Sequence, residues 1–302
     1  MAAPLRGTQS LVGQMGWVTS RPLLLALEVA WRWVFGIPFL AVCWIEFQKL
    51  LLAVPPESAG LDALDPQNPW VAAAQLARAW SLYRPHIAAT LLWLAPAAGL
   101  AWAVVSGVGR SLVLRRLDSA GLNRPRFRPF SLIVLQAGWA VLLAATWFCW
   151  FRSMEWAVST HFIPGDEPDL IGFSGWAIFL SLGFFTLWAL ISWTLSIAPL
   201  ILLLEERSAF SALGQSLRLG REFTGKLVEI NLVMGIVNIA LIVVAMVLSA
   251  APLPFSDQLG ASALHRVDAL AVLFYLVASD YFQLVRLKGF EEFWKMFRGP
   301  GS

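Results

Sequence analysis

The sequence has few charged residues for its length and few of the residues that build metal or disulfide sites. Only 14% of its 302 residues are Asp, Glu, Lys or Arg, whereas 58% are hydrophobic. This composition excludes a soluble domain with an ordinary polar surface. The two cysteines both fall in apolar runs, and the three histidines show no ligand-type spacing. The sequence therefore predicts neither a metal site nor a cofactor.

The short motifs of common enzyme classes are also missing. The sequence contains no Walker A loop, no Ser-x-x-Lys or Gly-x-Ser-x-Gly nucleophile motif and no His-Glu-x-x-His zinc motif. We therefore predict no catalytic residues. A lipid-active enzyme stays a minor alternative, since the only acidic pair available to it is Glu229 with Asp280.

What the sequence does contain is a series of apolar runs about 20 residues long, the length that a helix needs to cross ~30 Å of hydrocarbon. We predict an all-α fold, a polytopic membrane bundle of six transmembrane helices with amphipathic elbow helices at the membrane interface. The whole chain, residues 1–302, is predicted to be one membrane domain. Its crossings are expected at about 37–54, 87–107, 130–151, 176–200, 227–251 and 268–287.

Two segments next to the first crossings have amphipathic character. Residues 21–35, with Glu28 and Arg32 spaced i,i+4, are predicted either as a separate interfacial helix or as the start of one long tilted helix over 22–54. A second interfacial helix is predicted between Asn68, as its cap, and Pro85, as its end.

Other spacings predict local structure within the crossings. The run 171–204 would be ~51 Å long as one helix, so it must tilt, extend out of the bilayer or bend at Pro199. Glu46 and Lys49, spaced i,i+3, are predicted to form a local ion pair. Small residues at i+4 spacing in the second crossing should face another helix. They are Ala95, Gly99, Ala103 and Gly107.

Basic residues are concentrated on one side of the predicted bundle. The segments on that side carry seventeen of the 22 Lys and Arg residues, and the three opposite loops carry four. The positive-inside rule then places both termini in the cytoplasm. We expect anionic lipid headgroups on the cytoplasmic side as partners, with a membrane protein as a further partner and no nucleic acid. The expected lipid contacts are Arg110, Arg115, Arg116, Arg124, Arg126, Arg128, Arg218 and Arg221.

Asp280 is the most conspicuous polar side chain, because it lies inside the sixth crossing, where a carboxylate has to face protein or water. Two interpretations stay open: a functional group of a polar pocket, or a structural pairing with an arginine or asparagine of a neighbouring helix. On the first, Glu229, Asn231, Asp280 and Gln283 form a pocket facing the cytoplasm, and Arg218, Arg221 and Arg286 supply its positive charge.

One stretch resembles a known family. It is Ala212-Leu213-x-x-Ser216-Leu217-Arg218, then Phe223-x-x-Lys226-Leu227 and an apolar helix. This elbow and the six-span layout resemble bacterial inner-membrane proteins of the glycerophosphodiester phosphodiesterase membrane domain type and their uncharacterised relatives. In the phosphodiesterases a separate soluble barrel carries out the chemistry, and this chain has no such barrel. The resemblance therefore implies a membrane architecture and the bacterial cytoplasmic (inner) membrane, not hydrolase activity.

Two functions compete. The first is a non-catalytic integral membrane protein, an accessory or organising component that acts on lipid or protein partners. The second is a transporter or permease for a small solute or ion, with a polar pocket near Asp280 and Glu229. A transporter would be expected to show inverted repeats and discontinuous helices around a polar site at the membrane midplane.

Overall fold

The computed structural model describes residues 7–62, 68–117, 127–161, 169–222, 224–250 and 261–298. Helices dominate these residues, and no strand occurs among them. In chain order the helices are α1 (Gly7–Thr19), α2 (Pro22–Ala53), α3 (Pro69–Leu117), α4 (Pro129–His161), α5 (Leu170–Leu195), α6 (Ala198–Leu204), α7 (Ala209–Glu222), α8 (Thr224–Ala250) and α9 (Ala261–Arg298).

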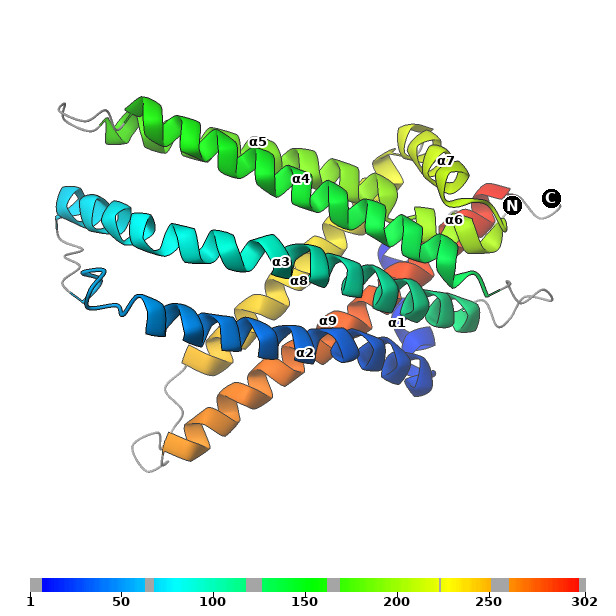
Figure 1. Ribbon diagram of the computed structural model, residues 1–302. Coiled ribbons are helices and arrows are strands. Elements are labelled where there is room, and N and C mark those ends of the chain that lie inside the picture. Colours follow the sequence, from blue (N-terminus) through cyan, green and yellow to red (C-terminus); the bar gives the residue numbers. More distant parts are fainter. Residues whose placement is uncertain are drawn as a thin grey trace.

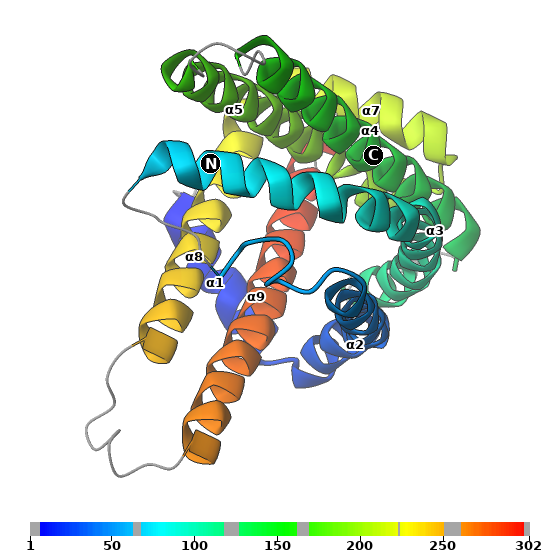
Figure 2. The same ribbon diagram turned by 60° about the vertical axis from the view of Figure 1, so that its left-hand side comes forward.

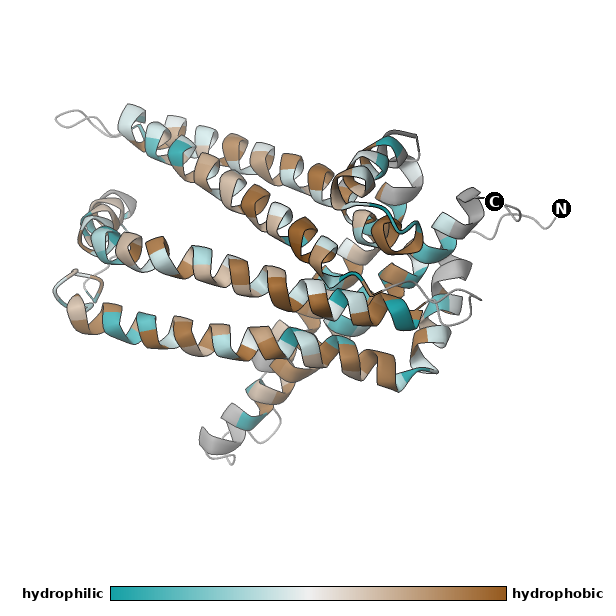
Figure 3. Cartoon of the chain, turned by 45° about the vertical axis from the view of Figure 1, so that its right-hand side comes forward, coloured by the Kyte–Doolittle hydropathy of each residue, from teal (hydrophilic) through white to brown (hydrophobic). Residues whose placement is uncertain are grey.

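Within the described residues, six helical stretches are long and apolar enough to cross a membrane. They belong to α2, α3, α4, the pair α5–α6, α8 and α9. Large apolar side chains such as Leu92 and Phe185 point outward along these helices, as expected for surfaces that contact lipid. Hydrophobic residues follow the long helices in Figure 3. The predicted all-α membrane bundle is confirmed.

The long helices form two groups. In Figure 1, α2, α3, α4 and α5 lie alongside one another in chain order, and each packs on the next. Helices α8 and α9 form a second pair, which crosses behind α2 and α3 and diverges from them toward the C-terminal end of α8 and the N-terminal end of α9 (Figures 1 and 2). The shorter helices α1, α6 and α7 gather at one end of the molecule, which we call the packed end.

The main hydrophobic core lies at the packed end. Its fully buried members include Leu132 of α4, Ile201 of α6, and Leu284 and Phe290 of α9. Helix α1 packs against α9, and Gln14 Nε2 of α1 donates a hydrogen bond to Glu292 Oε2 of α9 at 3.0 Å. The first and last helices therefore meet at this end, where Leu117 at the C-terminal end of α3 is also buried in the core.

The structure decides one boundary that the sequence left open and corrects another. Residues 21–35 are not a separate interfacial helix: they form one helix with the first crossing, α2, which includes Pro38, and the open alternative of a long helix over 22–54 is confirmed. The helix that starts at Pro69 does not end at Pro85, because α3 runs on to Leu117. Prolines inside membrane helices are tolerated where neighbouring helices and local adjustments satisfy the freed backbone groups.

The fourth apolar run bends near Pro199, which is one of the three possibilities that its length left open. Helix α5 ends at Leu195, and α6 begins at Ala198 with Pro199 in its first turn, where proline needs no amide partner. At its start, Asp169 caps α5 and accepts a hydrogen bond from the Gly172 amide at 2.8 Å. The Asp169 carboxylate also forms a hydrogen bond with His161 Nδ1 at 3.1 Å. Both hydrogen bonds favour the charged carboxylate and lower the pKa of Asp169.

Helices α3 and α4 approach each other closely at Gly107. A Cβ atom on this glycine would lie 2.8 Å from the backbone nitrogen of Ile133 in α4, so only glycine fits without a shift of the helices. One turn earlier, Ala103 is fully buried, whereas nothing lies within 4 Å of a Cβ built on Gly99. The predicted small-residue stripe thus forms a helix contact only in its second half.

Candidate functional site: a buried arginine pocket

Glu28 is fully buried near the start of α2. Its carboxylate pairs with positively charged side chains from two helices. It accepts hydrogen bonds from Trp31 Nε1 at 2.8 Å and from Arg32 Nε at 2.9 Å, both one turn further along α2. Arg110 of α3 adds an ion pair, with Nη1 3.5 Å from Glu28 Oε1. One carboxylate therefore binds a tryptophan and two arginines inside the membrane-spanning region.

Asp280 of α9 joins the same cluster. Its Oδ1 lies 2.7 Å from Arg32 Nη1, so Arg32 bridges Glu28 and Asp280 across two helices. The side chain of Asp280 is 6% exposed, and that of Arg32 is 25% exposed. The predicted structural pairing of Asp280 with an arginine of a neighbouring helix is confirmed, and the arginine is Arg32.

A cavity of about 290 Å³, with charged and polar side chains in its lining, adjoins this cluster between α2, α3, α4, α5, α6 and α9. Three arginines line it, one from each of three helices: Arg32, Arg110 and Arg286. Its polar wall is completed by Ser106, Gln136, Ser192, Ser196 and Gln283. The aromatic rings of Trp102 and Trp139 face the same space.

The charges around the cavity do not balance. Three guanidinium groups but only two carboxylates of the described residues, Glu28 and Asp280, belong to the cavity lining and the adjoining cluster, which gives a formal charge of +1. Within the described part of the chain, Nε of Arg286 and Nη1 of Arg110 are buried without a hydrogen-bond partner. Buried guanidinium nitrogens that lack a hydrogen-bond partner are stabilised by an anion that accepts their hydrogen bonds.

Aromatic packing holds the arginines in place. Trp31 packs on Trp102 of α3 with 5.8 Å between ring centroids, and the guanidinium carbons of Arg32 and Arg110 lie 5.4 Å from the Trp31 ring. Gly109 makes room for this tryptophan, because a Cβ atom there would collide with the indole. The arginines are therefore preorganised rather than free to turn away.

No family model, curated protein or solved structure matches the chain. The guanidinium groups that line the pocket have the geometry that matches the oxygens of phosphate and carboxylate. Within the residues that the structure describes, no three His, Cys, Asp or Glu side chains group together as metal ligands would.

Only some of the residues that were predicted to form a polar pocket lie at the cavity. Gln283 lines the cavity and Asp280 borders it through Arg32. Asn231 is buried on α8 but does not line the cavity. Glu229 is exposed on α8, outside this pocket, because the helical turn there points it away from the buried face of Asn231. The expectation that Glu229 shares the site with Asp280 is not met.

The arginines predicted to contact lipid have different positions. Arg110 lies in the buried cluster, and Arg128 bonds to Glu206, donating to its backbone oxygen at 2.7 Å. Arg116 and Arg218 are exposed, and Arg115 is half-buried beside Phe127. Arg124 and Arg126 lie outside the described residues, as does the side chain of Arg221. Of the three arginines expected to charge the pocket, Arg286 lines it and Arg218 does not; Arg32 and Arg110, which were not expected there, also line it.

Sequence reasoning missed Glu28 and Arg32 as site residues. Their i,i+4 spacing was visible, but it is equally typical of a solvent-exposed pair on an interfacial helix. The distinguishing signal was the continuation of the helix into the first crossing, which places the pair within the membrane domain.

Proposed function

We propose that this protein is a non-catalytic integral membrane protein that organises membrane partners by binding their anionic groups in the arginine pocket. The observation that carries the proposal is the uncompensated positive charge of Arg32, Arg110 and Arg286 around a cavity within the membrane-spanning helices. Arginine without a matching carboxylate is unfavourable in such surroundings unless an anion is bound. Membrane lipids with anionic headgroups are the most abundant source of such groups.

The charge pattern also supports an orientation. We propose that the packed end faces the cytoplasm of a bacterial inner membrane, since the C-terminal turn of α3, with Arg115 and Arg116, and the basic helix α7 lie at this end (Figure 1). The pocket then opens at the level of the cytoplasmic leaflet, where anionic headgroups attract arginine.

Sidedness can be measured with reporter fusions. A green fluorescent protein fused after Ser302 should fluoresce, and an alkaline phosphatase inserted after Gly60 should be active, because the first reporter folds in the cytoplasm and the second in the periplasm. The exchanged reporters at the same two positions are the controls. Active phosphatase at the carboxyl terminus would contradict the proposed orientation.

Arg286 offers the sharpest test of the pocket. It has no ion pair among the described residues, so Arg286→Gln removes a cation without stranding a carboxylate. Purified protein in neutral detergent would be titrated with phosphatidylglycerol or phosphatidylcholine and followed by native mass spectrometry. One lost charge-assisted hydrogen bond, worth about 1.5–3 kcal/mol, should weaken phosphatidylglycerol binding about tenfold or more and leave phosphatidylcholine binding unchanged.

Arg218→Gln is the matched control, because Arg218 is exposed on α7 and does not line the pocket. It should change phosphatidylglycerol binding less than twofold, about the effect of one screened surface charge. Equal losses in both variants would mean that general surface attraction, and not the pocket, binds the lipid.

A transporter is the second candidate, and one observation favours it. The break between α5 and α6 lies beside the cavity, with Ser196 and Pro199 in its lining, and discontinuous helices are typical of transporter sites. Uptake of inorganic phosphate into proteoliposomes that is lost in Arg286→Gln would support this function over the organising one.

A further inference from the structure

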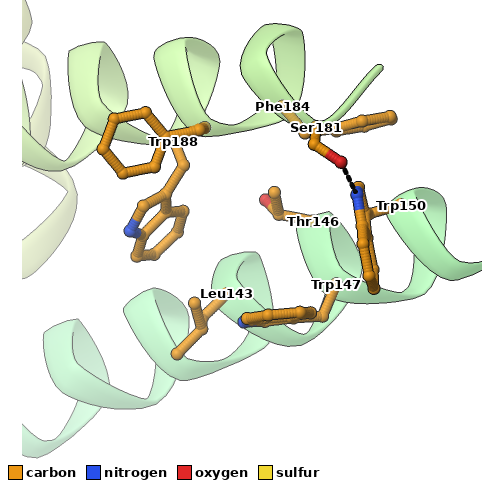
Figure 4. Close-up of a pocket in the computed structure, with 8 residues that line it drawn as sticks. Leu143, Thr146, Trp147, Trp150, Ser181, Phe184 and Trp188 are labelled. Carbon is orange, nitrogen blue, oxygen red and sulfur yellow. Dashed lines mark hydrogen bonds between the residues drawn. The ribbon is translucent and has the colours of Figure 1, made fainter. Parts of the chain in front are cut away.

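An aromatic groove of about 470 Å³ runs between α4 and α5, outside the arginine pocket. Figure 4 shows Leu143 and Trp188 toward one end of it, Thr146 between the helices, and Trp150 with Ser181 at the other end. Trp150 Nε1 donates to Ser181 Oγ at 3.0 Å, and Thr146 Oγ1 donates to the Leu142 carbonyl at 2.9 Å. These polar groups are satisfied within the protein, so the groove presents an almost purely apolar surface to a ligand.

The groove and the arginine pocket lie on the same faces of α4 and α5. On α4 the shared face carries Gln136, Trp139, Leu143, Trp147 and Trp150, spaced by three or four residues. On α5 it carries Ser181, Phe184, Trp188, Ser192 and Leu195 with the same periodicity. Along both helices the face is polar beside the arginines and aromatic further into the membrane.

One contact joins the two surfaces. Trp139 lines the arginine pocket and packs edge-on against Trp188 of the groove, with 4.9 Å between ring centroids. From Gln136 to Trp147 the helix rises by about 16 Å, close to one leaflet of a ~30 Å hydrocarbon core.

We infer that the arginine pocket and the α4–α5 groove form one binding site for an anionic lipid, with its headgroup on Arg110 and Arg286 and one acyl chain along Trp139, Trp188 and Trp147. The inference rests on the proposed function, since it names the anion as a lipid headgroup. A free anion would use the arginines but not the groove. A zwitterionic lipid would fill the groove but gain little from the net positive pocket.

The test uses phosphatidylglycerol with a photoactivatable diazirine near the middle of one acyl chain, added to the full-length protein in neutral detergent. After illumination, mass spectrometry should locate the adducts on the α4 and α5 residues that line the groove. Leu143→Trp fills the groove and should lower the adduct yield about tenfold, which corresponds to ~1.4 kcal/mol. Val141→Trp is the matched control. It places the same side chain two residues away from Leu143, at a position where Val141 is 69% exposed, so it should leave the adduct yield unchanged.

The arms of the experiment separate the two proposals. If Leu143→Trp and Val141→Trp behave alike, or if adducts spread evenly over all membrane helices, the lipid-chain site is wrong. Excess inorganic phosphate that prevents the adducts in the wild type would identify a free anion as the occupant and would also overturn it. Loss of adducts in Arg286→Gln supports the headgroup assignment, whereas adducts that are independent of Arg286 contradict the proposed function itself. Short-chain phosphatidylglycerol should bind the wild type and Leu143→Trp equally.

Discussion

Glu28→Gln should destabilise the protein by about 3–5 kcal/mol, the largest effect that we expect from a single conservative substitution. The amide keeps the shape of the side chain but removes the charge that neutralises Arg32 and Arg110. Asp280, which pairs with Arg32, would then be the single carboxylate near three guanidinium groups within the described residues. Thermal unfolding in detergent, followed by the fluorescence of the 16 tryptophans, measures the loss as a lower midpoint temperature.

Glu155→Gln is the matched control for this change. Glu155 also binds two arginines, Arg84 at 3.0 Å and Arg152 at 2.7 Å, but its side chain is 42% exposed. Exposed ion pairs contribute about 0–1 kcal/mol each, so the midpoint should hardly move. If both variants lose the same stability, the buried cluster has no special role. Anionic lipid should also restore more stability to Glu28→Gln than to Glu155→Gln, because it replaces the lost negative charge.

Gly107→Ala should produce the second large effect. The added methyl group would meet the backbone of Ile133 at 2.8–2.9 Å, so α3 and α4 must move apart. Overpacking of this kind costs about 1–3 kcal/mol and outweighs the gain of up to ~1 kcal/mol in helix propensity. The same unfolding measurement should show a lower midpoint.

Gly99→Ala provides the comparison on the same helix face. Nothing lies within 4 Å of a Cβ atom at this position, so the substitution meets no steric barrier and gains helix propensity. We expect an unchanged or higher midpoint temperature. A destabilisation of Gly99→Ala as large as that of Gly107→Ala would show that both glycines are needed for a reason other than the α3–α4 contact.

Local patterns in the sequence predicted the features that depend on neighbouring residues. Six apolar runs give six membrane-spanning stretches among the described residues, because the need to satisfy every backbone group in hydrocarbon leaves a helix as the solution. Pro199 marked the bend in the fourth run, and Glu46 with Lys49 form the expected ion pair at 2.7 Å. The predicted break at Pro85 was wrong, since α3 continues past it.

The candidate site could be predicted only in fragments. Asp280 was singled out because a carboxylate in an apolar helix needs a partner, yet its partner Arg32 is 248 residues away in the sequence and was expected at the membrane interface. Arg110 was grouped with the lipid-facing arginines because it follows an apolar run, although its side chain is only 13% exposed. Charge and hydropathy alone do not say which face of a helix its neighbours cover.

The sequence by itself determined that the chain is helical and how many stretches are long and apolar enough to cross a membrane, because these properties follow from composition and local order. Only the tertiary structure decided that Glu28 and Arg32 of α2, Arg110 of α3, and Asp280 and Arg286 of α9 meet around one cavity. The physical reason is that a helix fixes the spacing of its own residues but not its rotation against other helices. That rotation is set by close contacts such as Gly107 with Ile133 and Gly109 with Trp31.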